Sequence, residues 1–343
     1  MSETAAKIGL GADLFDTNGR PMFGPAPLSL FSGVGLAWEV VPVKGGQLPR
    51  EAFTDYEALL IGGAKVSEAE LKDESGRLRV IARNGVGYDA IDTRALNERG
   101  ILLTNTPIPV RRAVASIAVA FILALSLRMP VKSRLAREGR WRERANYPGV
   151  GLSKRTLGIV GLGGIGRELV RLMKPFDMEI LAADPNVAST AAADVGVGLC
   201  SIEDLLQRSD FVVLACLLND ETRHLMNATR LALMKPSAYL INVARGPIVD
   251  EKALIIALQE ARIAGAGLDV FEQEPPDPAN PLFTMDNVIS TAHCLCWTDS
   301  FVDAVARDAI TGIIKALQGQ LPDFVVNSEA LFHPRVRAWS NAT

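Results

Sequence analysis

Short apolar runs alternate with polar or turn-rich segments through the first 105 residues of the chain. This rhythm is typical of repeating units of one β-strand and one connecting segment or helix. The predicted strands are KIGLGA (7–12), AWEVVPV (37–43), ALLIGG (58–63), RVIAR (79–83) and GILLTN (100–105). The pattern therefore predicts a small parallel sheet in this part of the chain.

The second part of the chain repeats the alternation with clearer helical segments. Its six predicted strands are TLGIVGLG (156–163), MEILAAD (178–184), FVVLACL (211–217), SAYLINVA (237–244), IAGAGLDV (263–270) and NVIST (287–291). Helical patterns follow at GIGRELVRLMKPF (164–176), SIEDLLQRS (201–209) and EKALIIALQEARI (251–263). Near-continuous apolar strands fit a parallel sheet that helices cover on both faces, so we predict a doubly wound α/β architecture.

Two more segments have helical patterns. AVASIAVAFILALSL (113–127) is apolar over 15 residues, fewer than the roughly 20 that a membrane helix needs, and it predicts a buried helix. FVDAVARDAITGIIKALQG (301–319) is amphipathic and ends at a glycine, as helices often do. We expect no membrane partner, and we expect the residues after position 319 to pack back on the first sheet.

Composition narrows the class of protein. The chain has 343 residues, more than one average domain, and its 48% hydrophobic and 22% charged residues are ordinary for a globular protein. The formal net charge is −3, and Lys and Arg are scattered. Nucleic-acid binding needs a concentrated basic surface, so we expect no nucleic-acid partner.

The N-terminus and the cysteines indicate a compartment. The stretch MSETAAKIGLGADLFD carries acidic residues and no basic region before an apolar core, so it does not predict a secretory signal. The four cysteines, at positions 200, 216, 294 and 296, form no regular framework. Thiols stay reduced in the cytoplasm. We therefore expect a cytoplasmic chain without disulfides.

The first chemical motif is GLGGIG (161–166), which follows a predicted strand and opens a predicted helix. Gly161 permits a tight turn, Gly163 lets backbone amides approach a pyrophosphate, and Gly166 allows close packing of helix on strand. Asp184 ends the next strand, where a carboxylate can accept hydrogen bonds from ribose hydroxyls and repel a 2′-phosphate. The motif predicts a dinucleotide site that favours NAD over NADP. The alternative is a glycine turn with an unrelated aspartate.

A second group lies where later strands end. Arg245, Asp269 and His293 follow successive predicted strands, and Glu274 lies in the loop after Asp269. The carboxyl ends of parallel strands line the ligand crevice of an open α/β sheet, so these side chains can converge there. A base, a cation and an acid that holds the imidazole are what hydride transfer from a hydroxyl carbon requires. Purely structural alternatives stay open: Arg245 as a surface ion pair, Glu274 as a turn residue and His293 as a core or capping residue.

His293 lies in TAHCLCWTDS (291–300), beside Cys294 and Cys296. A zinc site needs about four ligands, and this stretch has no obvious fourth. We therefore expect no metal, and we interpret His293 as a proton carrier and the cysteines as small wall residues. Trp297 is expected either to pack in the core or to border the substrate.

These motifs resemble the D-isomer-specific 2-hydroxyacid dehydrogenases over nearly the whole chain. The similar segments are RNGVGYDAID (83–92), TNTP (104–107), GIVGLGGIGREL (158–169), LLNDETRHLM (217–226), NVARGPIVDE (242–251), GAGLDVFEQEP (265–275), NPL (280–282) and NV (287–288). The resemblance implies that His293 is the general acid/base, Glu274 its partner and Arg245 the substrate-binding arginine. It implies further cofactor contacts at Asp269, Gly164, Ile165, Cys216 and Val243. It also implies a substrate loop in which the amides of Val86 and Gly87 bind a carboxylate, assisted by Arg83.

The resemblance completes the predicted organisation. We expect a Rossmann NAD-binding domain (109–302) inserted in a flavodoxin-like substrate domain (1–108 plus 303–343). The implied activity is the NAD-dependent interconversion of a D-2-hydroxy acid and its 2-oxo acid, like glyoxylate/hydroxypyruvate reductases or phosphoglycerate dehydrogenases. Formate dehydrogenases resemble the chain less, because they carry glutamine where Glu274 stands. A different class stays open: the C-terminal-binding-protein corepressors share these residues and act as NAD(H)-gated scaffolds. Relatives dimerise, so we expect a homodimer.

Overall fold

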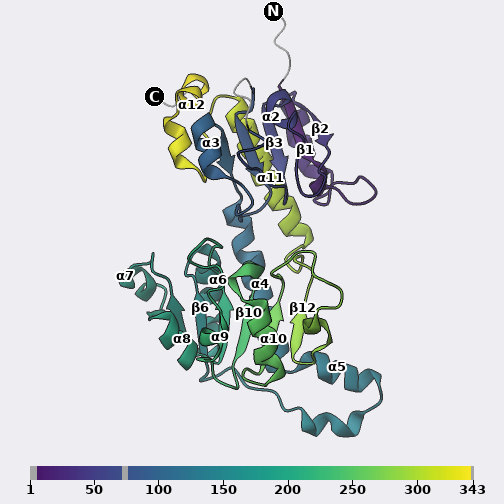
Figure 1. Ribbon diagram of the computed structural model, residues 1–343, viewed down its shortest axis with the longest axis vertical. Coiled ribbons are helices and arrows are strands. Elements are labelled where there is room, and N and C mark those ends of the chain that lie inside the picture. Colours follow the sequence, from purple (N-terminus) through teal and green to yellow (C-terminus); the bar gives the residue numbers. More distant parts are fainter. Residues whose placement is uncertain (1–5, 72–75, 341–343) are drawn as a thin grey trace, which may run out of the picture. The chain divides into compact units, whose positions relative to one another are not determined.

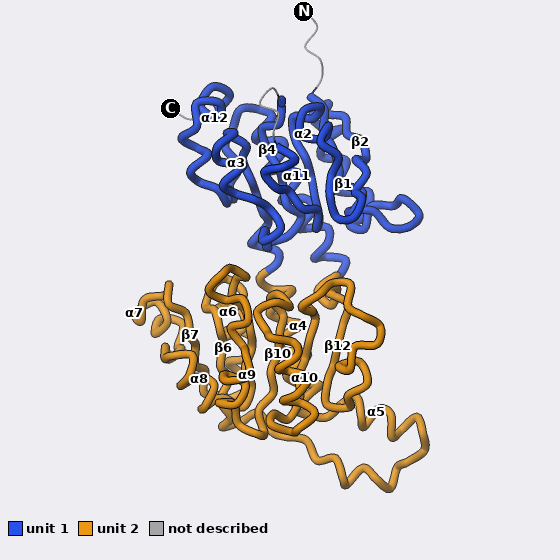
Figure 2. The backbone as a smooth tube through the Cα atoms, viewed as in Figure 1, with its two compact units in different colours: residues 1–110, 298–343 blue, residues 111–297 orange. Residues whose placement is uncertain are grey.

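The structure is a computed structural model that describes residues 6–71 and 76–340. The first five residues of the N-terminal stretch considered above lie outside the described residues. The chain divides into two compact units, residues 1–110 with 298–343 (unit 1) and residues 111–297 (unit 2) (Figure 2). From the sequence we expect the divisions at 108/109 and 302/303.

Unit 1 contains a five-stranded parallel sheet in the order β2-β1-β3-β4-β5. The strands are β1 (Lys7–Gly11), β2 (Ala37–Val41), β3 (Ala58–Ile61), β4 (Val80–Arg83) and β5 (Leu102–Thr104). The predicted parallel sheet is confirmed, and its strand order is that of flavodoxin-like folds. The central strand β3 is buried along its whole length, as a strand covered on both faces must be.

Helices from both ends of the chain cover this sheet (Figure 1). They are η1 (Ala12–Leu14), η2 (Ala26–Leu28), α1 (Ser29–Gly33), α2 (Ala52–Asp55), α3 (Thr93–Arg99), α11 (Asp299–Leu317), η7 (Ser328–Phe332) and α12 (Pro334–Trp339). Ile310 and Ile313 of α11 are fully buried in a core with Ile8 of β1. The segment after α11 also joins the unit, because Asn327 Oδ1 accepts a hydrogen bond from Leu103 N at 2.7 Å.

Unit 2 contains a seven-stranded parallel sheet in the order β12-β11-β10-β9-β6-β7-β8. The strands are β6 (Thr156–Val160), β7 (Glu179–Ala183), β8 (Gly198–Leu199), β9 (Phe211–Leu214), β10 (Tyr239–Asn242), β11 (Gly265–Leu268) and β12 (Val288–Ser290). The prediction of six strands missed β8, because two residues are too few to show a period. The order matches the Rossmann pattern, in which the first strand lies in the middle and the connections turn to opposite sides of it.

The helices of unit 2 include α5 and η3, which precede β6, and further helices between the later strands (Figure 1). They are α5 (Met129–Arg137), η3 (Trp141–Asn146), α6 (Gly164–Met173), η4 (Lys174–Phe176), α7 (Ser189–Ala193), α8 (Ile202–Arg208), α9 (Ala228–Leu231), η5 (Gly246–Ile248), α10 (Glu251–Gln259) and η6 (Pro281–Thr284). Side chains fix several helix starts: Ser201 caps α8 and Asp250 caps α10, each by accepting a backbone N–H of the first turn. The predicted helices after β6, β8 and β10 are confirmed.

The long apolar helix α4 (Pro107–Ser126) begins in unit 1 and continues in unit 2. It starts earlier than the predicted run because proline fits the first turn of a helix. By length and apolar composition alone α4 could cross a membrane. In the protein, however, Phe121 fills the space beside Gly267 of β11, where an added Cβ would lie 2.8 Å from the ring. One face of α4 therefore forms part of the core.

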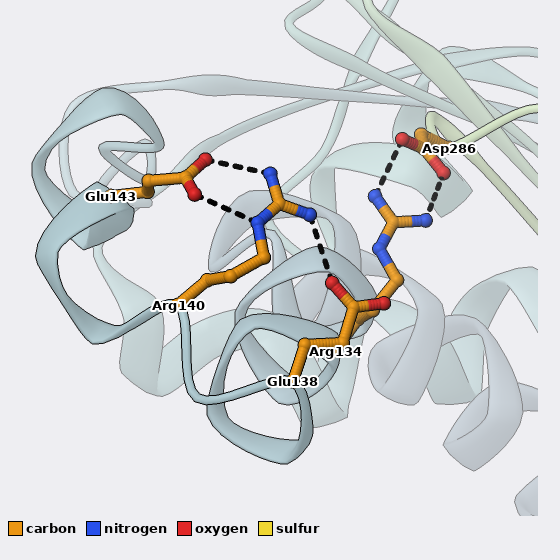
Figure 3. Close-up of polar contacts among 5 residues, drawn as sticks. All are labelled: Arg134, Glu138, Arg140, Glu143 and Asp286. Atoms are coloured by element: carbon orange, nitrogen blue, oxygen red, sulfur yellow. Dashed lines mark hydrogen bonds and ion pairs between the residues drawn. The ribbon is translucent and has the colours of Figure 1, made fainter.

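An arm of α5 and η3 follows α4 and projects from unit 2 (Figure 2). Charged pairs order it (Figure 3). Arg134 forms a two-pronged pair with Asp286, with N···O distances of 2.5 and 2.6 Å. Arg140 joins Glu138 at 2.8 Å and Glu143 at 2.6 Å. Bidentate arginine pairs fix orientation more firmly than single contacts, so the arm has a defined conformation.

Candidate active site

The Gly-rich loop connects β6 to α6, as predicted. Gly161 has a φ of +96°, and an added Cβ there would lie 2.7 Å from the backbone N of Cys216. At Gly166 an added Cβ would lie 2.3 Å from the carbonyl oxygen of Gly161. Gly163 instead faces open space, with no atom within 4 Å of such a Cβ. The backbone therefore requires glycine at positions 161 and 166. Gly163 leaves room for a pyrophosphate at the start of α6.

Asp184 follows the last residue of β7 and lies beside this loop. Its Oδ2 accepts a hydrogen bond from Leu162 N at 2.8 Å, and its Oδ1 accepts one from Asn186 N at 2.9 Å. The carboxylate is therefore held in one orientation and is only partly buried. Each oxygen keeps acceptor capacity for ribose hydroxyls.

The other predicted cofactor residues border the same edge of the sheet. Gly164 and Ile165 form the first turn of α6, Cys216 follows β9, and Val243 follows β10. Burial raises the pKa of the Cys216 thiol to about 11, so this side chain is a neutral thiol near pH 7. Val243 is buried. The two side chains therefore supply apolar surface rather than charge.

Arg245 lies just beyond the end of β10. The amide nitrogen of Asn242 donates to the Arg245 carbonyl oxygen at 2.9 Å, which fixes the backbone of the arginine. The next residue, Gly246, packs on the segment that follows β11, since an added Cβ would lie 1.7 Å from the Phe271 carbonyl oxygen. The loop that carries Arg245 is therefore held directly against the loop that leads to Glu274.

Asp269 follows β11 and is buried. Its Oδ1 accepts a hydrogen bond from the Thr291 hydroxyl at 2.6 Å and another from Leu295 N at 3.3 Å. Both partners belong to the segment after β12. Asp269 thus connects the ends of two neighbouring strands and orients the loop in which His293 lies.

Glu274 and His293 form a direct pair. Nδ1 of His293 lies 2.8 Å from Glu274 Oε2, and Glu274 Oε1 accepts a hydrogen bond from Phe271 N at 3.0 Å. His293 has a φ of +50°, which is uncommon for a residue other than glycine and indicates strain of a kind that collects at functional sites. Its imidazole is 42% exposed, so a substrate can reach it.

The pKa of Glu274 lies below its usual value of 4.5. Burial alone would raise this pKa, but the hydrogen bond and charge of His293, the N–H of Phe271 and the charge of Arg245 together outweigh burial. Glu274 is therefore ionised near neutral pH. A carboxylate only accepts hydrogen bonds, so Nδ1 of His293 must be the donor. Nε2 is then the nitrogen that can exchange a proton with a substrate.

The predicted substrate loop belongs to unit 1 and follows β4. Gly85 has a φ of +137° and lies under the guanidinium of Arg83. Asn105 holds the loop by donating to the Val86 carbonyl oxygen at 2.9 Å. Across residues 6–71 and 76–340, neither Val86 N–H nor Gly87 N–H donates a hydrogen bond. Two adjacent backbone donors are thus available.

The segment after β12 differs in part from expectation. Trp297 is 51% exposed, so its predicted packing in the core is wrong. It lies in a turn, closed by its N–H to the Cys294 carbonyl oxygen at 2.9 Å, rather than on an element with a buried face. Cys294 is exposed and Cys296 is buried, which places only the second thiol in a wall. Among the described residues, no three His, Cys, Asp or Glu side chains form a group that could hold a metal ion.

Two polar contacts near this edge were not predicted from the sequence. Thr291 holds Asp269, and its position directly after β12 could have indicated the role. His224 forms a second histidine–glutamate pair, with Nε2 at 2.5 Å from Glu272 Oε1. The spacing of these two residues along the chain indicates no contact, because only the fold brings their loops together.

A Rossmann sheet with a Gly-rich loop, a strand-end aspartate and an Arg–Glu–His group defines a nicotinamide-dinucleotide-dependent dehydrogenase. The comparison with known families agrees. The model described as "D-isomer specific 2-hydroxyacid dehydrogenase, NAD binding domain" matches residues 119–294. The chain belongs to the D-isomer-specific 2-hydroxyacid dehydrogenase family, and NAD is its cofactor.

Similar proteins carry several activities within this family. The chain is 39% identical over 295 residues to a glyoxylate reductase of Pyrococcus furiosus, covering 83% of this chain and 88% of that protein. It is 39% identical over 279 residues to a D-3-phosphoglycerate dehydrogenase of Methanocaldococcus jannaschii, covering 81% of this chain but 53% of that protein. The chain thus spans about half the length of the second relative.

A solved structure with a similar fold is the D-lactate dehydrogenase of Aquifex aeolicus, complexed with NAD and lactic acid. The TM-score is 0.80, with 26% sequence identity, and the match covers 93% of this chain and 99% of that one. This likeness supports the predicted arrangement of a Rossmann domain within a two-domain α/β protein.

Proposed function

We propose that the chain interconverts a D-2-hydroxy acid and its 2-oxo acid with NAD. The observation that carries the proposal is the 2.8 Å contact between His293 Nδ1 and Glu274 Oε2, with Arg245 close enough to lower the pKa of the same carboxylate. A general acid/base, a carboxylate that orients it and a cation are the groups this reaction needs.

His293 acts as the acid in the direction of reduction. Nε2 gives its proton to the carbonyl oxygen of the 2-oxo acid, and in oxidation the same atom takes the hydroxyl proton. Glu274 holds the ring through Nδ1 and so leaves Nε2 facing the substrate. When bound, the reduced nicotinamide supplies the hydride that the carbonyl carbon receives.

Arg245 binds the substrate carboxylate and the developing negative charge on the carbonyl oxygen. A guanidinium suits both tasks because its planar fork matches a carboxylate and its charge is permanent. In unit 1, the N–H groups of Val86 and Gly87, assisted by Arg83, are the groups that we assign to a substrate carboxylate. The absence of competing hydrogen bonds to these two N–H groups within residues 6–71 and 76–340 supports this role.

Asp184 selects NAD over NADP. Its carboxylate, held by Leu162 N and Asn186 N, lies where ribose hydroxyls bind in Rossmann folds and would repel a 2′-phosphate. Asp269 accepts a hydrogen bond from the nicotinamide amide. Its Oδ1 is oriented by Thr291, which supports this role.

The test is a panel of 2-oxo acids with NADH and with NADPH. Glyoxylate, hydroxypyruvate, pyruvate, phenylpyruvate and 3-phosphohydroxypyruvate cover small, polar, aromatic and phosphorylated side chains. We expect reduction of at least one at an ordinary enzymatic rate with NADH. Tight NADH binding without turnover of any of them would contradict the proposal and favour the scaffold alternative.

We also propose that the protein is a cytoplasmic homodimer. The arm of α5 and η3 projects from unit 2 and carries Trp141, which is 65% exposed. A large exposed aromatic on an ordered arm is typical of an interface. Light scattering should give a mass near twice 36.8 kDa at micromolar concentration.

A further inference from the structure

Arg111, in the first turns of α4, lies against the start of α6. An added Cβ at Gly164 would come within 2.6 Å of Arg111 Nε, 2.9 Å of its Cδ and 3.1 Å of its Cγ. The arginine side chain thus occupies the place that a side chain at position 164 would take. No positive φ requires glycine at this position. Glycine at position 164 instead leaves room for the side chain of Arg111.

The charge of Arg111 is not neutralised by a neighbour. Glu168, the acidic residue one turn further along α6, already pairs with Arg112 at 2.8 Å and with Arg171 at 2.8 and 3.0 Å. In the part of the chain that the structure describes, Arg111 itself forms no ion pair or hydrogen bond. Its side chain is exposed and able to meet a ligand.

The surroundings of Arg111 are electropositive. Gly163 caps α6 without a side chain, and no acidic residue lies in the first turn of the helix. The first N–H groups of a helix have no partner within the helix, and the helix dipole adds positive potential there. The positive charge of Arg111 is unfavourable at this end of α6 by itself. A bound anion would offset the repulsion. The open space at Gly163 lies next to both features.

We propose that Arg111 is a further cofactor-binding residue, whose guanidinium binds the pyrophosphate of the dinucleotide at the start of α6. This inference rests on the NAD site described above and adds a residue from a different helix. Gly164 contributes to pyrophosphate binding indirectly, because it leaves the space in which the Arg111 side chain lies. Arg111 acts on the pyrophosphate, which NADH and NADPH share. It therefore raises affinity for both and leaves the choice between them to Asp184.

The experiment measures equilibrium binding of NADH, ADP and adenosine to the full-length protein by fluorescence or calorimetry. Arg111→Ala should weaken NADH and ADP by about tenfold, the scale of a lost charge-assisted contact. Adenosine has no phosphate, so its affinity should not change. Arg111→Lys keeps the charge and should recover much of the loss. The ratio of NADH to NADPH affinity should stay as in the wild type.

Arg112→Ala is the matched control, because it removes an arginine from the next position of α4 whose charge Glu168 already neutralises. NADH affinity should stay within about twofold in this variant. Gly164→Ala should weaken NADH by displacing Arg111, and adding Arg111→Ala should then cost little more, because the two changes remove one interaction.

Unchanged NADH and ADP binding in Arg111→Ala, with normal binding by the wild type, would overturn the inference and leave the proposed function intact. An equal loss of NADH and ADP affinity in Arg112→Ala would also overturn the inference, because it would show that any positive charge on α4 has the same effect. Failure of the wild type to bind NADH would instead contradict the proposed function itself.

Discussion

Glu274 Oε2 lies 2.8 Å from Nδ1 of His293, although 19 positions separate the two residues in the chain. Glu274 reaches this place from the loop after β11, and His293 reaches it from the loop after the neighbouring strand β12. The pairing of adjacent parallel strands therefore brings the carboxylate to the imidazole, and Asp269 connects the two loops by accepting a hydrogen bond from the Thr291 hydroxyl.

Removing the imidazole should abolish most of the activity. His293→Ala should lower kcat by about 10²–10⁴-fold, the usual contribution of a general acid/base. NADH affinity should be retained, because the role proposed for His293 is proton exchange with the substrate and the residue holds no part of the Gly-rich loop. Steady-state kinetics with parallel NADH titration checks this. As a control, His333→Ala alters a histidine of unit 1 that caps α12 and should leave kcat nearly unchanged.

The lowered pKa of Glu274 predicts a pH-dependent stability difference. A carboxyl whose pKa is lower in the folded than in the unfolded state stabilises the fold above its unfolded pKa, about 4.5 here. That stabilisation is lost as the pH falls through the lowered folded pKa. Glu274→Gln lacks the titration. Urea unfolding should therefore show that the difference in free energy of unfolding between wild type and variant shrinks as the pH falls below 4.5. A gap independent of pH would contradict the assignment.

Arg245→Lys should mainly weaken substrate binding. Lysine keeps the charge but cannot reproduce the planar fork on a carboxylate, so KM for the 2-oxo acid should rise more than kcat falls. The matched control is Arg262→Lys, since Arg262 pairs with Glu260 on the surface of the same unit. A fall in kcat at unchanged KM would show that Arg245 acts only on the transition state.

Asp184 should set the preference for NADH. The wild type should show higher kcat/KM with NADH than with NADPH, and Asp184→Asn should narrow the gap by removing the charge that repels the 2′-phosphate. Asparagine can still accept a hydrogen bond from one of the two N–H groups, of Leu162 or Asn186, but its NH2 group faces the other, so one of the two hydrogen bonds is lost. Equal efficiencies with both cofactors in the wild type would refute this role.

Substitution of two glycines in the Gly-rich loop should affect different properties, stability for Gly166 and NADH affinity for Gly163. Gly166→Ala would place a Cβ 2.3 Å from the Gly161 carbonyl oxygen, so the backbone must shift. We expect a loss of about 1–3 kcal/mol in the free energy of unfolding, as for overpacked sites. Gly163→Ala meets open space and should fold normally but bind NADH more weakly. Thermal denaturation and NADH titration of the two variants separate these effects.

The sequence by itself determined the two parallel sheets and the edge at which the chemistry collects. Apolar runs bounded by turn residues predicted five strands in unit 1 and six of the seven in unit 2, because burial on both faces makes a strand continuously apolar. GLGGIG and the residues at strand ends indicated the cofactor loop and the Arg–Glu–His group, because carboxyl ends of parallel strands share one edge.

Only the tertiary structure decided which side chains meet across elements. It paired Glu274 with His293, laid Arg111 over Gly164 and joined His224 to Glu272. It also left Trp297 exposed, although its size favours burial. These contacts depend on how loops and helices pack. The positions of loops and helices can differ by several ångströms although the pattern of apolar and polar residues stays the same. The hydrophobic periodicity of a segment predicts which face of a helix or strand is buried. It does not predict how close that face lies to residues that are distant in the chain.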